Sequence, residues 1–347
     1  MSTLKVDNIR HNNATSDAIT MASDGTCTAK LTSVGGGPLS HRNYFINGNT
    51  IIWQRGTSNP NVNNYGCDRW WFANGATRVD RSTVVPDGFA YSMKVTSNGS
   101  TTSIGQPIEL IDTGRSQFEP NATYTLSFYA RTDSGTNNIS ATVYYRNGKF
   151  SGTNQVNWSP VSQNMGTMTT TFQRFSKTFT APAAPNANNT VLAIEFNNTA
   201  TYYITGMQFE RGDTMTAYEH RSFGDELLRC QRYYHCVYRR GASSDGNLSI
   251  GALGSLYTGN SLYIDMTFPT QMRTTPTLEA PTATDRFNCC PTTCIDFGNP
   301  SLIHGQKNAV TLNATLQSGN TAGRVGNVFA KTANWTEGEK LAFTAEL

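Results

Sequence analysis

The sequence predicts a mostly β protein with an antiparallel sandwich, one connecting helix and a second, smaller C-terminal β-sandwich. Tyr, Phe and Trp make up 11% of the 347 residues, and Asn, Thr, Ser and Gly supply most of the polar positions. This composition is typical of β-sheets joined by polar turns. Many short runs alternate apolar and polar side chains, as a strand with one buried face does. A single stretch has its apolar residues at helical spacing.

The charge is too low for a nucleic-acid partner. The net charge is +3, and charged residues are 15% of the chain, against about 25% in an average soluble protein. We therefore expect no nucleic acid and no anionic membrane as partner. No apolar run approaches the length of a membrane span, and the start, MSTLKVDNIRHNN, has no apolar signal core. We expect no membrane insertion and folding in a cytoplasm.

Residues 1–38 form the first predicted segment. Two short apolar stretches, residues 4–9 and 18–31, indicate a strand and a hairpin. They carry too few apolar side chains to bury a core alone, so the segment needs partners or frays as an arm. Gly35-Gly36-Gly37-Pro38 then predicts a hinge.

Residues 39–221 are predicted to form the sandwich. Alternating runs with turn clusters between them indicate several short antiparallel strands. The apolar faces of these runs are Phe89, Tyr91, Met93 and Val95; Tyr124, Leu126, Phe128 and Ala130; Ile139, Ala141, Val143 and Tyr145; Leu192, Ile194 and Phe196; and Tyr203, Met207 and Phe209.

Residues 222–240 are predicted to form the connecting helix. Ser222 and Asp225 have the spacing of a capping box, and Arg239-Arg240 before Gly241 suit a C-terminal end. The apolar stripe consists of Leu227, Cys230, Tyr234 and Val237.

Two packing arrangements remain open for this stripe. At a-and-d spacing it would let three copies meet on an axis, but the same stripe would serve to pack on the chain's own sandwich. We favour a mixed arrangement, with the stripe on the axis and Phe223, Leu228 or Tyr233 on the chain's own domain.

Residues 241–347 are predicted to form the smaller β-sandwich, with a strand at its very end. Its long polar loops, residues 241–259, 281–300 and 317–326, are candidates for binding because loops on a rigid sheet vary without unsettling the core. The alternating apolar residues are Leu262, Ile264, Met266 and Phe268; Val310, Leu312, Ala314 and Leu316; and Leu341, Phe343, Ala345 and Leu347.

The seven cysteines predict free thiols buried as small apolar groups. Cys289, Cys290 and Cys294 have a spacing open to metal ligation, but no second Cys/His pair has finger-like spacing. We therefore expect no metal and no cofactor.

No catalytic constellation is evident, so we expect no enzyme. The five histidines are scattered, and no nucleophile elbow, phosphate loop or dinucleotide fingerprint occurs. Paired carboxylates can hydrolyse a glycoside, and Glu109, Asp112 and Glu119 lie near each other in the sequence. The chain lacks the repeat period of a long solenoid, which disfavours a glycan depolymerase.

Aromatic side chains are the candidates for binding. Trp53, Trp70, Trp71 and Trp158 would suit a platform for stacking on sugars, because a flat indole covers a pyranose face well. Trp70 and Trp71 are adjacent, so on a strand they would point to opposite sides and one would lie in the core. Tyr257, in the first candidate loop, is a further candidate.

Three stretches carry a resemblance to a known family. INGNTIIWQRGT, YGCDRWWF and ITGMQFERGDTMTAYEHRSFGDELLRCQRYY resemble a block in tail-fibre and related virion proteins of tailed bacteriophages, notably marine and cyanobacterial ones. The resemblance covers roughly residues 40–240. The two ends, TLKVDNIRHNNATSDAITM and FPTQMRTTPTL with LAFTAEL, are similar to the ends of such proteins over shorter stretches.

The order of features in residues 39–221 also resembles jelly-roll carbohydrate-binding modules. In these modules the first and last strands lie side by side, which implies pairing of INGNTIIW with YYITGMQFE. Many of them carry an acidic residue in the closing strand that helps bind a structural calcium. Residues 202–209 contain no acid, which puts a calcium in doubt at this position.

The resemblance implies a short homotrimeric tail fibre in the virion that attaches the particle to host surface glycan or protein. Residues 1–38 would join three copies and fasten them to adaptor or nozzle proteins of the tail. A fibre or spike anchored to capsid proteins is the alternative, and a glycan-cleaving depolymerase is less well supported.

Overall fold

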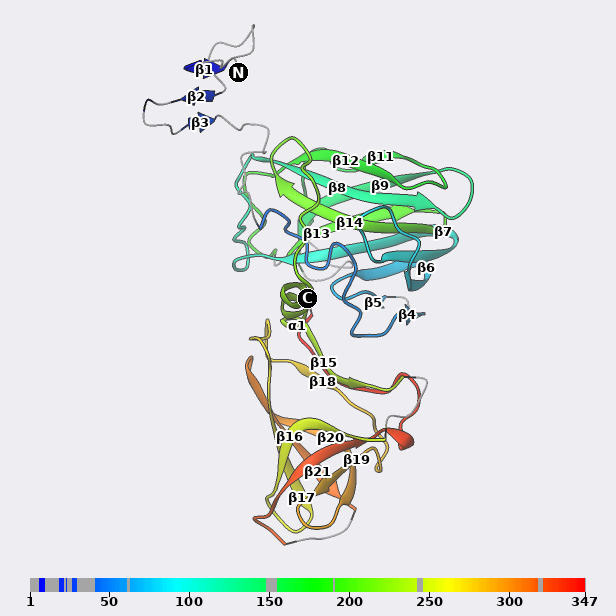
Figure 1. Ribbon diagram of the computed structural model, residues 1–347, viewed down its shortest axis with the longest axis vertical. Coiled ribbons are helices and arrows are strands. Elements are labelled where there is room, and N and C mark those ends of the chain that lie inside the picture. The colour runs from blue at the N-terminus through cyan, green and yellow to red at the C-terminus, as the bar shows by residue number, and fades with distance from the viewer. Residues whose placement is uncertain are drawn as a thin grey trace, which may run out of the picture.

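The computed structural model describes residues 6–9, 19–21, 23, 27–29, 41–60, 63–147, 155–189, 191–241, 246–317 and 321–346. Within these residues the protein is mostly β with one α-helix, which confirms the predicted class. Figure 1 shows a central β domain and a C-terminal barrel, with the helix between them.

The described strands of the N-terminal segment form a small three-stranded antiparallel sheet. It contains β1 (Asn8–Ile9), β2 (Ile19–Met21) and β3 (Cys27–Ala29), in the order β1-β2-β3. The strand and hairpin expected from the two apolar stretches are therefore present. The predicted hinge at residues 35–38 lies outside the described residues.

The central domain is an antiparallel jelly-roll sandwich with the strand order β10-β9-β13-β7-β14-β8-β12. The long strand β7 joins both layers, because its first half pairs with β14 and its second half with β13. Strand β6 runs alongside β7 over both halves. The strands are β4 (Ser58–Asn59), β5 (Asn64–Tyr65), β6 (Trp71–Ser82), β7 (Ser92–Glu109), β8 (Thr123–Thr132), β9 (Asn137–Arg146), β10 (Val156–Asn157), β11 (Gln163–Met168), β12 (Gln173–Thr180), β13 (Val191–Asn198) and β14 (Tyr202–Arg211).

The core of this domain lies between the layers and contains the predicted apolar faces of β8, β9 and β13. On β14 the prediction is confirmed for Met207 and Phe209 and fails for Tyr203. Tyr202 and Ile204 are in the core with Met207 and Phe209, whereas Tyr203 is outside it. The register of β14 shifts between Thr205 and Gln208. A bulge of this kind moves the following residues to the other face.

Gly206 lies inside this bulge at φ +61. A Cβ there would approach Phe89 Cζ to 2.7 Å and Tyr129 Cδ2 to 2.9 Å. Both the backbone conformation and the close contact favour glycine.

The opening segment beside β14 is not the predicted strand. Tyr44 N donates to Phe209 O at 2.9 Å and Met207 N donates to Gly48 O at 2.9 Å, so the segment does lie beside β14. Asn47 and Thr50 have left-handed φ values of 58° and 56°, which interrupt any regular strand.

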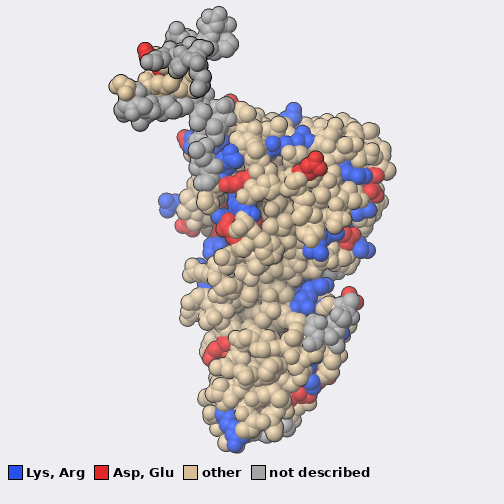
Figure 2. Space-filling view, viewed as in Figure 1, with Lys and Arg blue, Asp and Glu red and all other residues tan. Residues whose placement is uncertain are grey.

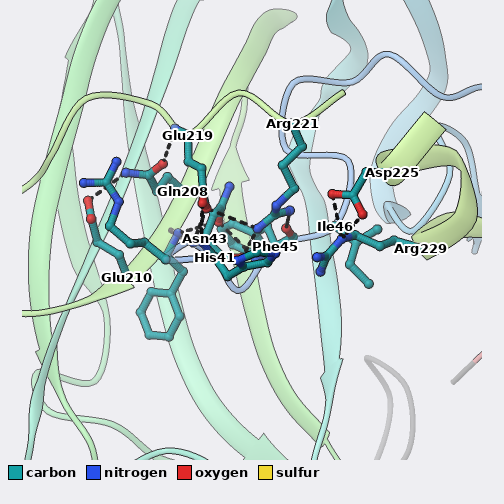
Figure 3. Close-up of polar contacts among 12 residues, drawn as sticks. His41, Asn43, Phe45, Ile46, Gln208, Glu210, Glu219, Arg221, Asp225 and Arg229 are labelled. Carbon is teal, nitrogen blue, oxygen red and sulfur yellow. Dashed lines mark hydrogen bonds and ion pairs between the residues drawn. The ribbon is translucent and has the colours of Figure 1, made fainter. Parts of the chain in front are cut away.

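Side chains hold this irregular segment in place (Figure 3). Arg221 donates to Phe45 O at 3.0 Å and also to Asn43 O. It forms an ion pair of 2.8 Å with Glu226, whose other oxygen accepts from Asn47 N at 2.6 Å. The side chains of Arg221 and Glu226 are 6% and 1% exposed, so this is a buried polar cluster.

The helix α1 spans Phe223–Gln231, which corrects the predicted helix of residues 222–240. Ser222 caps it by accepting from Asp225 N at 3.2 Å, as expected. The chain then turns at Arg232 and enters β15 (Tyr234–Arg239). Strand β15 pairs with β23 (Lys340–Thr344), which lies near the far end of the sequence. The helix therefore ends where the chain begins to pair with this distant strand, which the sequence around residue 232 does not reveal.

The proposed axial stripe is also corrected. Cys230 and Tyr234 are 0% exposed within a single chain, so they are not available to meet other copies. Val237 packs against the barrel core, and Leu227 is half-buried. The residues expected on the chain's own domain differ as well: Tyr233 is buried, but Phe223 is 61% and Leu228 47% exposed.

The C-terminal region is a closed barrel with the strand order β16-β17-β21-β20-β19-β22, capped by the sheet β15-β23-β18. It therefore closes on itself, where two separate sheets were expected. Its domain begins at β15, before residue 241. The strands are β16 (Asn247–Leu256), β17 (Ser261–Thr267), β18 (Thr277–Glu279), β19 (Phe287–Cys290), β20 (Ile295–Gly305), β21 (Ala309–Leu316) and β22 (Val325–Lys331), with a 3-10 turn η2 (Thr332–Asn334) before β23.

The predicted apolar faces fill this barrel. Those of β17 and β21 lie in its core, with Leu341, Phe343 and Ala345. Leu347 lies outside the described residues.

Two arginines of the central domain bind Glu346, which follows β23. Arg55 Nη2 lies 3.1 Å from Glu346 Oε1, and Arg69 Nη1 contacts the other carboxylate oxygen. The guanidinium of Arg55 lies 3.5 Å from the ring centre of Tyr234, and that of Arg69 lies 3.6 Å from Tyr233. The three charged side chains are 1–6% exposed, so buried charges join the two domains.

Asp68 balances the second positive charge of this cluster. Its Oδ1 lies 3.5 Å from Arg55 Nη1, and Gln54 Nε2 donates to its Oδ2 at 2.6 Å. Burial raises the pKa of Asp68 to about 6, although Arg55 opposes the shift. The cluster thus contains two arginines and two carboxylates.

Charged residues are scattered over the face shown in Figure 2, with Lys and Arg interspersed among Asp and Glu. None of the helices in the described ranges is long and apolar enough to cross a membrane.

Candidate functional site

Three of the tryptophans predicted to stack on sugars are buried. Trp70 and Trp158 are 1% and 0% exposed and lie in the sandwich core, and Trp53 is 9% exposed. Trp70 Nε1 donates to Asn47 O at 3.0 Å, and Trp53 Nε1 donates to Thr50 O at 2.6 Å. These residues stabilise the fold, and the prediction that they bind a ligand is wrong.

Trp71 and Tyr257 reach the surface. Trp71 is half-buried on the opposite side of β6 from the core residue Phe72, as the adjacent pair Trp70-Trp71 predicted. Tyr257 is 66% exposed on the C-terminal barrel. The structure therefore places the two candidates on different domains.

Trp71 belongs to a larger set of side chains on one layer of the sandwich, formed by β6, the second half of β7, β13 and β9. Cross-strand pairing places Trp71, Gly105, Glu195 and Thr142 in one row across these strands. The neighbouring rows carry Asn197 and Tyr144 on the same side. We call Trp71, Tyr144, Arg146, Glu195 and Asn197 the aromatic face.

The aromatic face lies on the side of the layer opposite the core, because the alternate residues point into the core. On this face Tyr144 and Arg146 are each only 3% exposed. Val143 and Tyr145 are core residues that flank Tyr144, and Ile194 and Phe196 flank Glu195. Successive side chains of a strand point to opposite sides.

A chain of polar contacts runs through this face. Arg146 Nη1 donates to the Tyr144 hydroxyl at 2.7 Å and lies 3.5 Å from Glu195 Oε1. Burial raises the pKa of Glu195, while the nearby Tyr144 hydroxyl and the charge of Arg146 oppose the shift. Burial raises the pKa of Tyr144 as well.

The middle of the face carries small and polar residues. Gly105 has no side chain and separates Trp71 from Glu195 in their row. In the next row Ser103 Oγ donates to Asn197 Oδ1 at 2.8 Å. An indole at one side, a carboxylate at the other and an amide beside them can stack on one face of a sugar and bind its hydroxyls.

The structure does not gather the acids considered for glycan cleavage. Glu109 binds Arg232 at 3.0 Å and the Tyr233 hydroxyl at 3.0 Å. Glu119 pairs with Arg211, and Asp112 lies in an exposed turn.

Glu109 and Glu195 are acids on the same layer, but they lie far apart. Glu195 pairs with Gly105, four residues from Glu109 along β7, which is about 13 Å at strand spacing. Glycosidase carboxylates are at most about 9.5 Å apart. The backbone positions of the pair are therefore farther apart than the carboxyl groups of a glycosidase pair.

The cysteines differ from the prediction at one place. Cys290 and Cys294 form a disulfide across the connection between β19 and β20, because this hairpin brings them together. Cys67, Cys230 and Cys289 are free and buried, as expected, and Cys236 is half-buried. Cys27 has no described side chain. No group of three or more His, Cys, Asp or Glu side chains suited to a metal occurs in the described ranges.

The larger hollows lie elsewhere. One of about 760 Å³ on the barrel is lined by Leu253, Asp265 and His304 among others, with no Trp, Tyr or Phe. Another of about 510 Å³ lies between the central domain and α1, beside Glu109 and Arg232. The aromatic face offers a sugar both a stacking surface and hydrogen-bonding groups, whereas the hollow on the barrel has no aromatic side chain for stacking. The hollow beside α1 also has two tyrosines, Tyr44 and Tyr233, in its lining.

Tyr144, Arg146, Glu195 and Asn197 were missed in the sequence. They occupy the outward positions of the runs whose inward positions were predicted as core. A signal was present: Glu195 is the one acid in the run VLAIEF, and Tyr144 is a large aromatic at an outward position.

Solved structures of other proteins show similar arrangements over about half of the chain. The C-terminal family 22 carbohydrate-binding module of Clostridium thermocellum Xyn10B is 18% identical, with 46% of this chain and 100% of that chain covered and a TM-score of 0.33. A putative sugar binding protein from Bacteroides thetaiotaomicron is 12% identical, with 49% and 100% covered and a TM-score of 0.34. These identities are too low to transfer a binding residue.

No curated protein matches the chain significantly. A family described as a carbohydrate binding domain matches residues 56–201. This range contains every residue of the aromatic face. The central domain therefore carries a match to a carbohydrate-binding module, and its fold is a jelly-roll sandwich.

Proposed function

We propose that the protein binds glycans through the aromatic face of its central domain. The observation that carries this proposal is the match of residues 56–201 to a carbohydrate binding domain. The face supplies what such binding needs: Trp71 for stacking, and the polar groups of Glu195 and Asn197 for sugar hydroxyls.

The layout of the face favours a chain of sugars over a single one. Trp71 on β6 and the partly exposed Glu195 on β13 are separated by β7, which is about 10 Å across two strand spacings. A ligand in contact with both residues has to cross this distance, so we propose an oligosaccharide that lies across the strands.

Replacing Trp71 with alanine is expected to weaken glycan binding at this face at least tenfold. The loss corresponds to about 1.4 kcal/mol, which the removal of one stacking surface accounts for. The full-length protein and the variant would be compared on an array of neutral and acidic oligosaccharides, with calorimetric titration of each glycan that the unmodified protein binds.

The control is Tyr129→Ala, because Tyr129 is a half-buried outward aromatic on β8, in the other layer. It should leave binding unchanged. Glu195→Gln offers a second variant that removes the charge and keeps the shape. If both Trp71→Ala and Glu195→Gln bind every glycan as the unmodified protein does, the aromatic face is not the site.

We further propose that this binding attaches a virion of a tailed phage to its host, with the protein as a short homotrimeric tail fibre. The sequence resemblance over residues 40–240 supports this role, and the small N-terminal sheet fits a segment that needs partners. Three copies would make weak sites effective through multivalency. A fibre or spike anchored to the capsid remains the alternative, to be separated by what residues 1–38 bind.

The trimer predicts a mass in solution of about three times 37.9 kDa for the full-length chain. Light scattering on the purified protein over a range of concentrations would measure it. A monomer at all concentrations would contradict the fibre, while leaving the glycan-binding proposal to be tested with Trp71→Ala.

A further inference from the structure

A pair of stacked tyrosines is exposed at one end of the C-terminal barrel. The rings of Tyr257 and Tyr263 are 4.9 Å apart between centres and inclined by 5°. Tyr257 is 66% exposed and Tyr263 is half-buried. We propose that this pair, with the polar hollow beside it, is a second glycan site, specific for neutral saccharides and independent of the aromatic face.

The hollow is lined by β20 and β21 and lies beside β17, the strand that carries Tyr263. Pairing across the strands places Tyr263, Asn313 and Ser301 in one row. The next row contains Ser261, Thr315 and Gly298, and Tyr257 N donates to Ser261 O at 2.9 Å. Asn313 is thus one strand spacing, about 5 Å, from Tyr263.

The hollow has a volume of about 360 Å³, within the range of about 300–1,000 Å³ that is usual for small-molecule sites. Its polar lining consists of Thr284, Asn299, Ser301, Asn313, Thr315 and Gln317. These side chains carry only hydroxyl and amide groups.

This lining defines the chemical class of the ligand. Hydroxyls and amides both donate and accept hydrogen bonds, as the hydroxyls of a sugar require. No charged side chain of the described residues lines the hollow, so a uronate or sialic acid would lose the hydration of its carboxylate without gaining a cation. The site therefore favours uncharged sugars.

Asn313 is held in a useful orientation. Its Oδ1 accepts from Ser261 Oγ at 3.0 Å. With Oδ1 bound to Ser261, the amide NH₂ is the end available to a ligand oxygen.

The tip that carries Tyr257 is also fixed before any ligand arrives. Ser261 N donates to Thr258 Oγ1 at 3.0 Å, and Leu316 N donates to Asn260 O at 3.0 Å. Leu256 N donates to Arg324 O at 2.8 Å. A preorganised platform loses little conformational entropy on binding.

The test compares the full-length protein with Tyr257→Ala and Asn313→Asp on an array of neutral and uronic-acid-bearing oligosaccharides. Tyr257→Ala removes the outer stacking ring, and Asn313→Asp replaces the NH₂ donor with a charge. Both variants are expected to lower the affinity for the same neutral glycan at least tenfold. The control is Leu253→Ala, because Leu253 is a 58% exposed apolar residue of β16 that does not line the hollow. This variant should not lower the affinity for that glycan.

Trp71→Ala separates this site from the aromatic face, because it should leave that neutral glycan bound at the barrel. Thermal unfolding of each variant checks that the barrel is intact. The proposal requires Tyr257→Ala and Asn313→Asp to weaken the same neutral glycan while Trp71→Ala does not; any other pattern overturns it. The aromatic face is judged separately, by the glycans that Trp71→Ala weakens.

Discussion

Replacing Glu346 with alanine is expected to lower the free energy of unfolding by about 3–5 kcal/mol. Glu346 is the shared partner of Arg55 and Arg69, whose side chains are 6% and 1% exposed. Without it Asp68 alone would face two buried positive charges. Removing one partner of a buried ion pair costs far more than the pair itself contributes, because the remaining charge is buried with neither a partner nor water to stabilise it.

Denaturant unfolding, followed by Trp fluorescence and circular dichroism, would measure this loss. Glu346 also joins the barrel to the central domain, so the variant should unfold in two steps if the unmodified protein unfolds in one. The matched control is Glu337→Ala, which removes an exposed acid of the same domain and should change stability by less than about 0.5 kcal/mol. Equal stability of the two variants would mean that Arg55 and Arg69 can remain buried between the two domains without Glu346.

Most of the alternating runs predicted the core correctly, because they depend only on local chemistry. Among the exceptions, Phe89 and Tyr91 are half-buried and lie outside the core. Along Tyr124, Leu126, Phe128 and Ala130 each inward position is apolar, and all four residues lie in the sandwich core. A strand with one buried face needs this period whatever its neighbours are. The barrel strand from Leu262 to Met266 follows the same rule.

The sequence predicted too long a helix, because the position at which the helix ends depends on pairing with a distant strand. Tyr234 and Val237 continue the helical spacing of Leu227 and Cys230, yet the chain leaves the helix at Arg232. Tyr and Val also favour strands, and pairing with β23, about a hundred residues away, supplies the hydrogen bonds of β15. Local spacing does not distinguish these outcomes.

The aromatic face could be predicted only in part for the same reason. Trp71 was identified as one of an adjacent pair, but its neighbours in space come from other strands. Glu195 and Tyr144 are more than seventy residues away from it in the sequence and join it only through the order β9-β13-β7 and the pairing of β6 with β7. Strand order depends on the whole fold.

Replacing Arg221 with methionine is expected to lower the free energy of unfolding by about 3–5 kcal/mol. The guanidinium is bound to Glu226 at 2.8 Å, lies 3.4 Å from Glu219, and donates to two backbone carbonyls of the irregular opening segment. Methionine fills similar space but provides neither charge nor donors. Glu226, with 1% of its side chain exposed, would then carry an unpaired charge.

The control for this variant is Arg229→Met, in the last turn of α1. Arg229 pairs with Asp225 at 3.2 Å, and both side chains are at least one-third exposed, so its loss should cost less than about 0.5 kcal/mol. Arg221→Met combined with Glu226→Gln should recover part of the stability, since the double variant no longer buries an unpaired carboxylate. If the double variant is only as stable as Arg221→Met, the unpaired carboxylate is not the source of the cost. The cost then arises from the backbone carbonyls of residues 43–45, which lose the donors of Arg221 in both variants.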